Sequence, residues 1–265
     1  MKNLVVLKFW PTFFLVFGIQ VVYGALYAGS LSVFNMSVET DTMYVISLYF
    51  YLFIYVALIL WLSKKQNIKI KNFYSIPHIK DVMIMVIIVF FAGIIVTIPL
   101  SEPIAFIKSL TNYQLSITSI STRPIFPLLD LQRMLLGPIV EELFFRGFIL
   151  RTFLKRYPPQ YAIILSSLIF GIYHPNLGNL IFYITAGVIF SILYYAHNSL
   201  TICTLAHIIW NATTFFRGRI IELDASNSII LLGIYILALY ALILMLKKLY
   251  RNKAPNGINN SFFST

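Results

Sequence analysis

The sequence predicts an all-α protein, a polytopic transmembrane helical bundle. Hydrophobic residues make up 59% of its 265 residues, the mean hydropathy is +0.84, and only 11% of the residues are charged. A soluble domain of average composition contains about 25% charged residues. The apolar residues form runs of about 20 residues, which is the length that a helix needs to cross a bilayer.

Helices are expected rather than a β-barrel. Both structures pair every backbone group inside a bilayer, but barrel strands alternate apolar and polar residues, whereas these runs are continuously apolar. We predict about eight spans. Their expected ranges are 9–34, 43–62, 82–100, 129–155, 160–174, 178–197, 199–216 and 228–246.

The spans are expected to form one compact membrane domain over residues 1–254, because most of their connections are short. The first run is longer than the apolar region of a signal peptide and lacks a clear cleavage site, so we interpret it as a span. Residues 255–265 are polar, with glycine and asparagine, and are expected to be a disordered tail.

Basic residues predict the orientation of the bundle. With a cytoplasmic N-terminus, 14 basic residues lie at inside positions and 5 lie at outside positions, together with six of the nine acids. The inside residues are Lys2, Lys8, Lys64, Lys65, Lys69, Lys71, Lys80, Arg151, Lys155, Arg156, Lys247, Lys248, Arg251 and Lys253. Both termini should therefore be cytoplasmic. The long outside segment 101–130 either lies along the membrane surface or acts as a substrate gate.

The net charge of +11 does not indicate a nucleic-acid partner, because the basic residues lie at the ends of apolar runs rather than in one patch. Membrane lipids are the expected surroundings. The single cysteine, Cys203, lies in an apolar run and is expected to be a small core residue, with no disulfide framework.

Ionisable and amide side chains lie inside three of the predicted spans. The fourth span contains Glu141, Glu142 and Arg146, the fifth ends at His174, and the seventh contains His207 and Asn211. A charged group near the bilayer centre costs about 2.5–3.5 kcal/mol on insertion scales and is functional by default.

Helix geometry separates the two adjacent acids. Glu142 and Arg146 are four residues apart on one face, with the acid on the N-terminal side, as an ion pair prefers. Glu141 lies about 100° around the helix, so it lacks that partner. His207 and Asn211 are also four residues apart and share a face. We therefore expect Glu142 to be structural and Glu141 to be available for chemistry.

Depth along the helices indicates convergence. At about 1.5 Å per residue, Glu141 and His174 each lie roughly 21 Å from the cytoplasmic ends of their spans. Asn211 and His207 lie about 18 Å and 12 Å from Ser199. Four groups on three helices can therefore meet in one layer.

The ordered motifs resemble those of the CPBP family of intramembrane proteases, which includes the type II CAAX prenyl endopeptidases. The patterns EExxxR, FxxxH and HxxxN occur in this order, as Glu141-Glu142 with Arg146, Phe170 with His174, and His207 with Asn211. The resemblance covers residues 129–216, which we take as the motif-bearing core. Phe170 by itself is most simply a packing residue.

The resemblance implies an intramembrane endopeptidase, and the side chains suit that chemistry. A buried carboxylate is a suitable general base for a nucleophilic water, so Glu141 is expected to take this role, with His174 orienting the water. His207 and Asn211 are expected to stabilise the oxyanion. Gly137-Pro138, one turn earlier, either opens a polar cavity by kinking the helix or is tolerated without function.

The need for a cofactor stays open at this point. Zinc could be held by Glu141, His174 and His207, with water as the fourth ligand. We favour a site without a metal because the amide of Asn211 suits an oxyanion and is a poor zinc ligand.

Two other functions remain as alternatives. A proton-coupled transporter also uses buried Glu and His residues, although this chain lacks the repeated halves common in transporters. The second alternative is a non-catalytic membrane scaffold. The substrate is a peptide or protein that the sequence does not identify, and the short loops suit a bacterial inner membrane.

Overall fold

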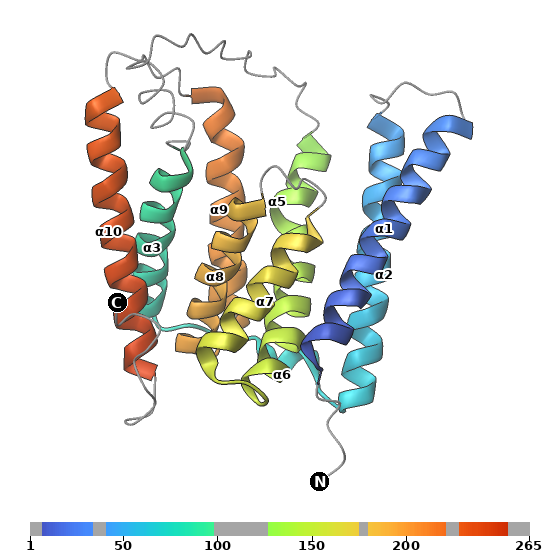
Figure 1. Cartoon of the computed structure of the whole chain (residues 1–265), viewed down its shortest axis with the longest axis horizontal. Helices are drawn as coiled ribbons and strands as arrows, with labels where there is room; N and C mark the ends of the chain where they lie inside the picture. The colour runs from blue at the N-terminus through green and yellow to red at the C-terminus, as the bar shows by residue number, and fades with distance from the viewer. Residues whose placement is uncertain (1–6, 34–40, 98–126, 175–179, 221–227, 254–265) are drawn as a thin grey trace.

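The computed structural model describes residues 7–33, 41–97, 127–174, 180–220 and 228–253. Within these ranges all regular structure is helical, without a strand, and eight long helices are present (Figure 1). They are α1 (Phe9–Val33), α2 (Asp41–Gln66), α3 (Ile79–Thr97), α5 (Pro127–Glu142) with its continuation through η2 (Leu143–Leu150) and α6 (Arg151–Leu154), α7 (Pro159–Tyr173), α8 (Leu180–His197), α9 (Leu200–Ile220) and α10 (Ser228–Lys253). A short 3-10 helix, η1 (Ile70–Phe73), follows α2.

Each predicted span coincides with one of these helices, so the all-α prediction is confirmed for the described residues. The largest difference is at α10, which continues seven residues beyond the expected end at residue 246. The predicted tail 255–265 lies outside the described residues. So does the predicted surface segment 101–130, except for its last four residues, which begin α5.

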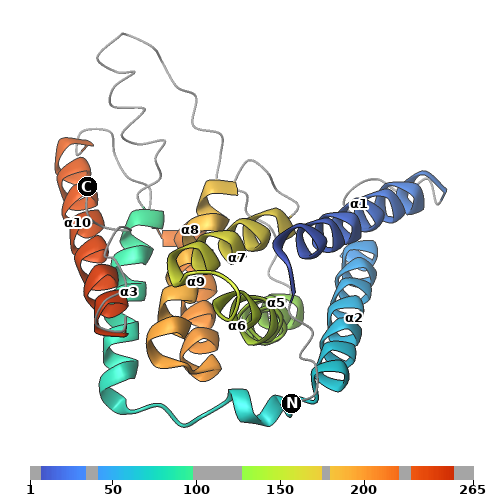
Figure 2. The same cartoon turned by 60° about the horizontal axis from the view of Figure 1, so that its bottom comes forward.

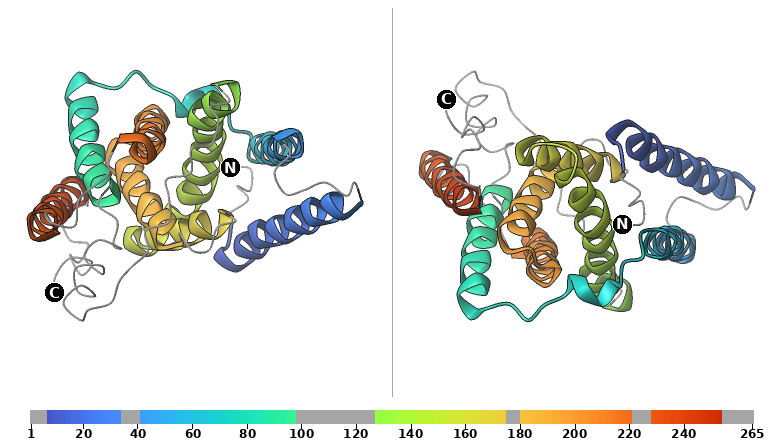
Figure 3. Two further views of the ribbon diagram at one scale, coloured as in Figure 1. Left: turned by 90° about the horizontal axis from the view of Figure 1, so that it is seen from above. Right: turned by 90° about the horizontal axis from the view of Figure 1, so that it is seen from below.

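The helices are arranged in three groups (Figures 1 and 3). Helices α1 and α2 lie on one side, α3 and α10 lie on the other, and α5–α6, α7, α8 and α9 fill the centre. Helix α1 begins and α10 ends at the same end of the bundle (Figure 1). The connection from α2 through η1 to α3 crosses that end (Figure 2).

The outer helices carry large apolar side chains on their exposed surface. Trp10 on α1 is 63% exposed, Phe53 on α2 is 69% exposed, and Leu237 on α10 is 69% exposed. A water-soluble bundle rarely exposes such large side chains over continuous surfaces. Among the described residues, α8 alone is long and apolar enough to meet a length and composition test for a membrane span. The number of spans therefore stays a prediction.

Small residues allow α7 and α8 to pack closely at the centre. Ser167 and Gly171 are four residues apart on α7, and Gly187 and Ser191 are four residues apart on α8. The hydroxyl oxygens of Ser167 and Ser191 lie 3.5 Å apart, and a Cβ built on Gly187 would lie 3.0 Å from Cα of Ser167. This spacing of small residues is typical of membrane helices that pack backbone to backbone.

The fourth long helix changes its winding in the middle. It passes through the buried Pro138 as an α-helix and then continues as the π-helix η2, in which every residue is buried. The backbone N–H of Arg151 bonds to the carbonyl of Arg146, five residues earlier. Short π-helical segments occur frequently at functional sites, and this one begins directly after Glu142.

Replacing Gly187 with alanine should loosen the central pair of helices. The new methyl would lie too close to the backbone of α7, so we expect Gly187→Ala to destabilise the protein by about 1–3 kcal/mol through overpacking. The measurement is the thermal unfolding midpoint of the purified protein in detergent. Gly18→Ala is the matched control, because nothing lies within 4 Å of its added Cβ. Equal midpoints for the two variants would contradict this account of the packing.

Candidate active site

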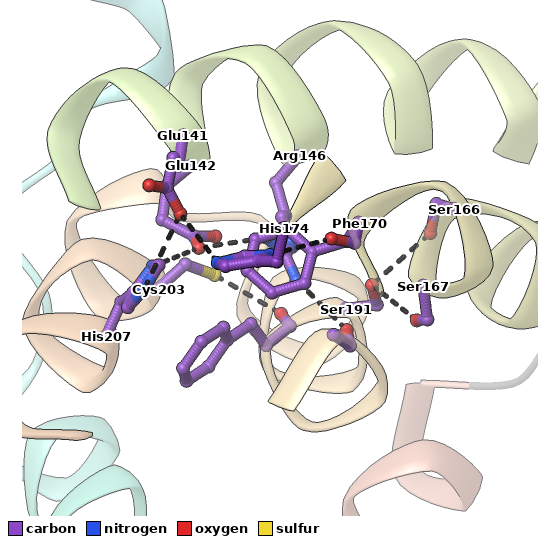
Figure 4. A network of polar contacts seen from close by, with 12 residues as sticks. Glu141, Glu142, Arg146, Ser166, Ser167, Phe170, His174, Ser191, Cys203 and His207 are labelled. Atoms are coloured by element: carbon purple, nitrogen blue, oxygen red, sulfur yellow. Dashed lines mark hydrogen bonds and ion pairs between the residues drawn. The ribbon is translucent and has the colours of Figure 1, made fainter. Parts of the chain in front are cut away.

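Polar side chains from three of the long helices meet at the centre of the bundle (Figure 4). Glu141 and Glu142 come from the end of α5, Arg146 from η2, His174 from the residue after α7, and His207 from α9. The structure therefore places Glu141 beside His174 and His207, which are three of the four groups that the depth estimate assigns to one layer.

Arg146 is a fully buried charged side chain of this cluster, with 1% of its surface exposed. Its Nη1 donates to Oε1 of Glu142 at 2.9 Å, which is the ion pair that the spacing predicts. Its Nη2 donates to the carbonyl of Gly187 on α8 at 3.1 Å. The guanidinium carbon also lies 4.5 Å from the ring centre of Phe170 and 5.3 Å from that of Phe190. Arg146 thus joins η2 to both α7 and α8.

Glu142 has a second partner that the sequence did not reveal. Its Oε1 lies 2.8 Å from Nδ1 of His207 on α9. The carboxylate already accepts from Arg146, so the imidazole Nδ1–H is the donor. The carboxylate therefore fixes the orientation of His207 and leaves the Nε2 atom of this ring turned toward Glu141.

His174 is oriented in the same way by a different acceptor. Its Nδ1–H donates to the carbonyl of Phe170 at 2.9 Å. Its ring stacks on Tyr183 of α8, with ring centres 3.9 Å apart and planes inclined by 13°. Phe170 therefore does more than pack, because its carbonyl and its ring contact two polar members of the site. As in His207, the Nε2 atom of His174 is left on the side of Glu141.

Glu141 faces both imidazoles without bonding directly to either. Its Oε2 lies 4.0 Å from Nε2 of His174 and 3.8 Å from Nε2 of His207. This oxygen is buried, and it has no hydrogen-bond partner among the described residues. The other oxygen, Oε1, lies beside Gly137, where an added Cβ would make an ordinary contact with it at 3.6 Å. The carboxylate and the two rings therefore surround one small space.

Asn211 lies one turn after His207 on α9 and is half-buried. The ring of His207 stacks on Phe190, with ring centres 4.7 Å apart, so the α9 side of the site packs against α8.

The spacing between Glu141 and the two imidazoles is wider than that of zinc ligands and admits a bridging water. Tetrahedral ligands at the usual zinc distances of about 2.0–2.1 Å would lie about 3.3–3.4 Å apart, whereas the observed separations are 3.8 and 4.0 Å. In the described ranges no three His, Cys, Asp or Glu side chains are arranged to hold a metal ion. A water at about 2.8 Å from each partner bridges such separations readily.

Several supporting residues were missed by the sequence analysis. Gly187 and Ser191 carry a detectable signal, the four-residue spacing of small residues on an apolar helix. Gln20 has the single amide side chain within the first run, and its Nε2 donates to the carbonyl of Tyr173 beside His174. Tyr183 and Phe190 have no sequence signal that separates them from ordinary core aromatics.

Cys203 and His197, which the sequence analysis did not assign to the site, lie outside the polar cluster around Glu141 or play no part in its ion pairs. Cys203 is buried, and its thiol donates to the carbonyl of Phe190 at 3.5 Å, which confirms the prediction of a core residue. His197 lies 3.3 Å from Asp81 at the end of α8.

Comparison with known proteins supports the motif assignment. The model of a family described as Type II CAAX prenyl endopeptidase Rce1-like matches residues 124–213. A Bacillus subtilis (strain 168) protein named "Putative membrane peptidase YdiL" is 33% identical over 85 residues, which are 32% of this chain and 35% of that protein. The match thus spans about a third of the length of this curated relative. No solved structure matches the chain significantly.

The segment that matches the family model contains every residue of the three motifs, from Glu141 to Asn211. All of these motif residues except Asn211 lie in the polar cluster that Figure 4 shows at the centre of the bundle. Residues 124–213 therefore match the core of the Rce1-like family, and together with the bacterial relative this match supports the resemblance to the CPBP family of membrane proteases.

Proposed function

We propose that this protein is an intramembrane peptidase that activates a water between Glu141 and two histidines. The observation that carries the proposal is the buried Oε2 of Glu141, which lies 4.0 and 3.8 Å from the Nε2 atoms of His174 and His207. Polar groups at this separation are commonly bridged by one water. A water held there would have a carboxylate and an imidazole as proton acceptors.

Glu141 is the proposed general base. Peptide hydrolysis requires a hydroxide-like nucleophile, and a positioned carboxylate removes the proton as the oxygen attacks the carbonyl carbon. His174 helps to hold the water because its Nδ1–H is occupied by the carbonyl of Phe170, which leaves Nε2 as an acceptor. The proton can then pass to the amine that leaves when the peptide bond breaks.

His207 and Asn211 are proposed to stabilise the oxyanion. The Nδ1–H of His207 is committed to Glu142, so Nε2 can donate to the oxyanion only when the ring is protonated. The Glu142 carboxylate would stabilise that imidazolium, which gives Glu142 a positioning role as well as its ion pair with Arg146. The amide of Asn211 supplies a donor that needs no proton transfer.

The proposed substrate is a membrane-associated peptide or protein, of the prenylated CAAX, leader or signalling type. The Type II CAAX prenyl endopeptidase description of the matching family supports the first of these. We further propose eight spans with cytoplasmic termini in a bacterial plasma membrane, supported by the apolar outer faces and by the bacterial relative.

Changing each of the two adjacent acids to glutamine should have a different effect on activity and on protein abundance. Glu141→Gln should abolish hydrolysis while the protein remains folded and abundant, because this side chain pairs with no buried charge. Glu142→Gln should leave Arg146 without its ion pair, a loss of about 3–5 kcal/mol, and so reduce abundance as well. Abundance in membranes and the loss of cleavage products in a membrane proteome are the measurements.

A double variant tests whether the lower abundance of Glu142→Gln comes from the unpaired charge of Arg146. Glu142→Gln with Arg146→Met removes both charges, and its abundance should exceed that of Glu142→Gln alone. Full cleavage by Glu141→Gln protein would rule out the general base and favour a transporter or a scaffold.

Oxyanion stabilisation and zinc binding predict different effects at Asn211. Without a metal, Asn211→Ala should reduce kcat by about 10²–10³-fold with little change in KM, as losing one oxyanion donor does. The purified, active protein should contain no stoichiometric zinc by mass spectrometry and should resist chelators. Zinc whose removal abolishes activity, and whose return restores it, would overturn the metal-free mechanism.

The orientation can be tested with an impermeant thiol reagent. A cysteine at Lys65, which is exposed near the end of α2, should react in inverted vesicles but not in intact cells. The native Cys203 is fully buried and gives little background. A cysteine at Ser116, in the segment expected outside, is the reciprocal control. Labelling of Lys65→Cys from outside intact cells would reverse the proposed topology.

A further inference from the structure

A second polar feature lies away from the candidate active site, at the end of the bundle where α1 begins and α10 ends. It is a cavity of about 410 Å³ between the α2–α3 connection, the start of α6 and the end of α8. Its polar lining consists mainly of Lys69, Arg151, Asn67, Asn72 and Asn198, with Phe73 at its side. None of these residues takes part in the proposed peptidase chemistry.

The charges of the cavity favour an anion. Lys69 and Arg151 each contribute a cation, and no aspartate or glutamate is among the described residues that line it. The guanidinium carbon of Arg151 lies 5.1 Å from the ring centre of Phe73. Phe73 in turn packs edge to face on Phe148 of η2, with ring centres 5.5 Å apart. The two aromatic rings therefore support the side chain of Arg151 beside the cavity and leave its positive charge without a neutralising carboxylate.

The backbone at two edges of the cavity is unusual. Asn67 and Asn198 have φ angles of 53° and 50°, and they are the only residues other than glycine with positive φ in the described ranges. Asn67 follows α2 and Asn198 follows α8, so each ends a helix in the left-handed conformation that asparagine tolerates. Both line the same cavity, together with the amide of Asn72. The side-chain amides of these three asparagines are neutral groups that can donate hydrogen bonds beside the two cations.

We propose that this cavity binds the phosphate group of an anionic lipid headgroup. Phosphate oxygens accept charge-assisted hydrogen bonds from guanidinium, ammonium and amide groups. The cavity lies at the end of the helices whose flanks carry the excess of basic residues, next to outer helices with exposed apolar side chains. A lipid can occupy both environments at once, with its headgroup in the cavity and its chains along the helices. The inference requires the membrane setting but not the peptidase activity.

The test uses the full-length protein purified in a neutral detergent and titrated with short-chain phosphatidylglycerol. Native mass spectrometry should detect one tightly bound lipid, and the thermal midpoint should rise with lipid concentration. Phosphatidylcholine should bind at least about tenfold more weakly. Lys69→Gln/Arg151→Gln should weaken phosphatidylglycerol binding by at least about tenfold, since charged hydrogen bonds are lost.

The matched control removes the same charge outside the cavity. Lys248→Gln/Arg251→Gln changes two exposed residues on α10 at the same end of the bundle, and its affinity should stay close to that of the native protein. Asn72→Asp gives an independent variant that keeps both cations and adds a repelling carboxylate at an exposed position. It should also lose the lipid, and it replaces the double variant if that protein does not fold.

Two results would overturn the proposal. One is equal lipid binding by the cavity variants and the α10 control, which would mean that the cavity is not the site. The other is inorganic phosphate that binds as tightly as phosphatidylglycerol, with the same sensitivity to the variants. That result would assign the cavity to a soluble anion rather than to a lipid.

Discussion

The buried guanidinium of Arg146 constrains the rest of the structure more than any other group. A charge with 1% of its surface exposed must be compensated by its surroundings, and this one is compensated by a carboxylate, a backbone carbonyl and two aromatic rings. These partners belong to α5, α8 and α7. Glu142 extends the network to α9 through His207. A shift of any one of the four central helices would therefore expose the guanidinium of Arg146 or break part of the network that compensates its charge.

The same network sets the chemistry of the site. Two different acceptors, the carboxylate of Glu142 and the carbonyl of Phe170, take the Nδ1–H groups of the two histidines. Both rings then present Nε2 toward Glu141, whose carboxylate pairs with no arginine or lysine among the described residues. This support by fixed neighbours agrees with the proposed activity, because preorganised groups need no rearrangement during a reaction.

The π-helix η2 links the two polar regions of the molecule. It begins directly after Glu142 and ends directly before Arg151, which lines the cavity at the end of the bundle. Its wider winding carries Arg146 toward α8 while every residue from 143 to 150 stays buried. An ordinary helix would direct these side chains differently, since its hydrogen bonds close one residue earlier. The winding of this segment thus affects both the candidate active site and the cavity.

The sequence by itself determined the eight helices and indicated the titratable residues of the polar cluster, because both depend on local properties. Long apolar runs specify helices whatever their partners, and the four-residue spacing of Glu142 and Arg146 brings them together on one helix. The tertiary structure decided what depends on distant residues. The contact of Glu142 with His207 joins positions 65 residues apart, and the stacking of Tyr183 on His174 requires the packing of α8 against α7. The imidazole nitrogen that faces Glu141 follows from those contacts, so no local pattern could have predicted it.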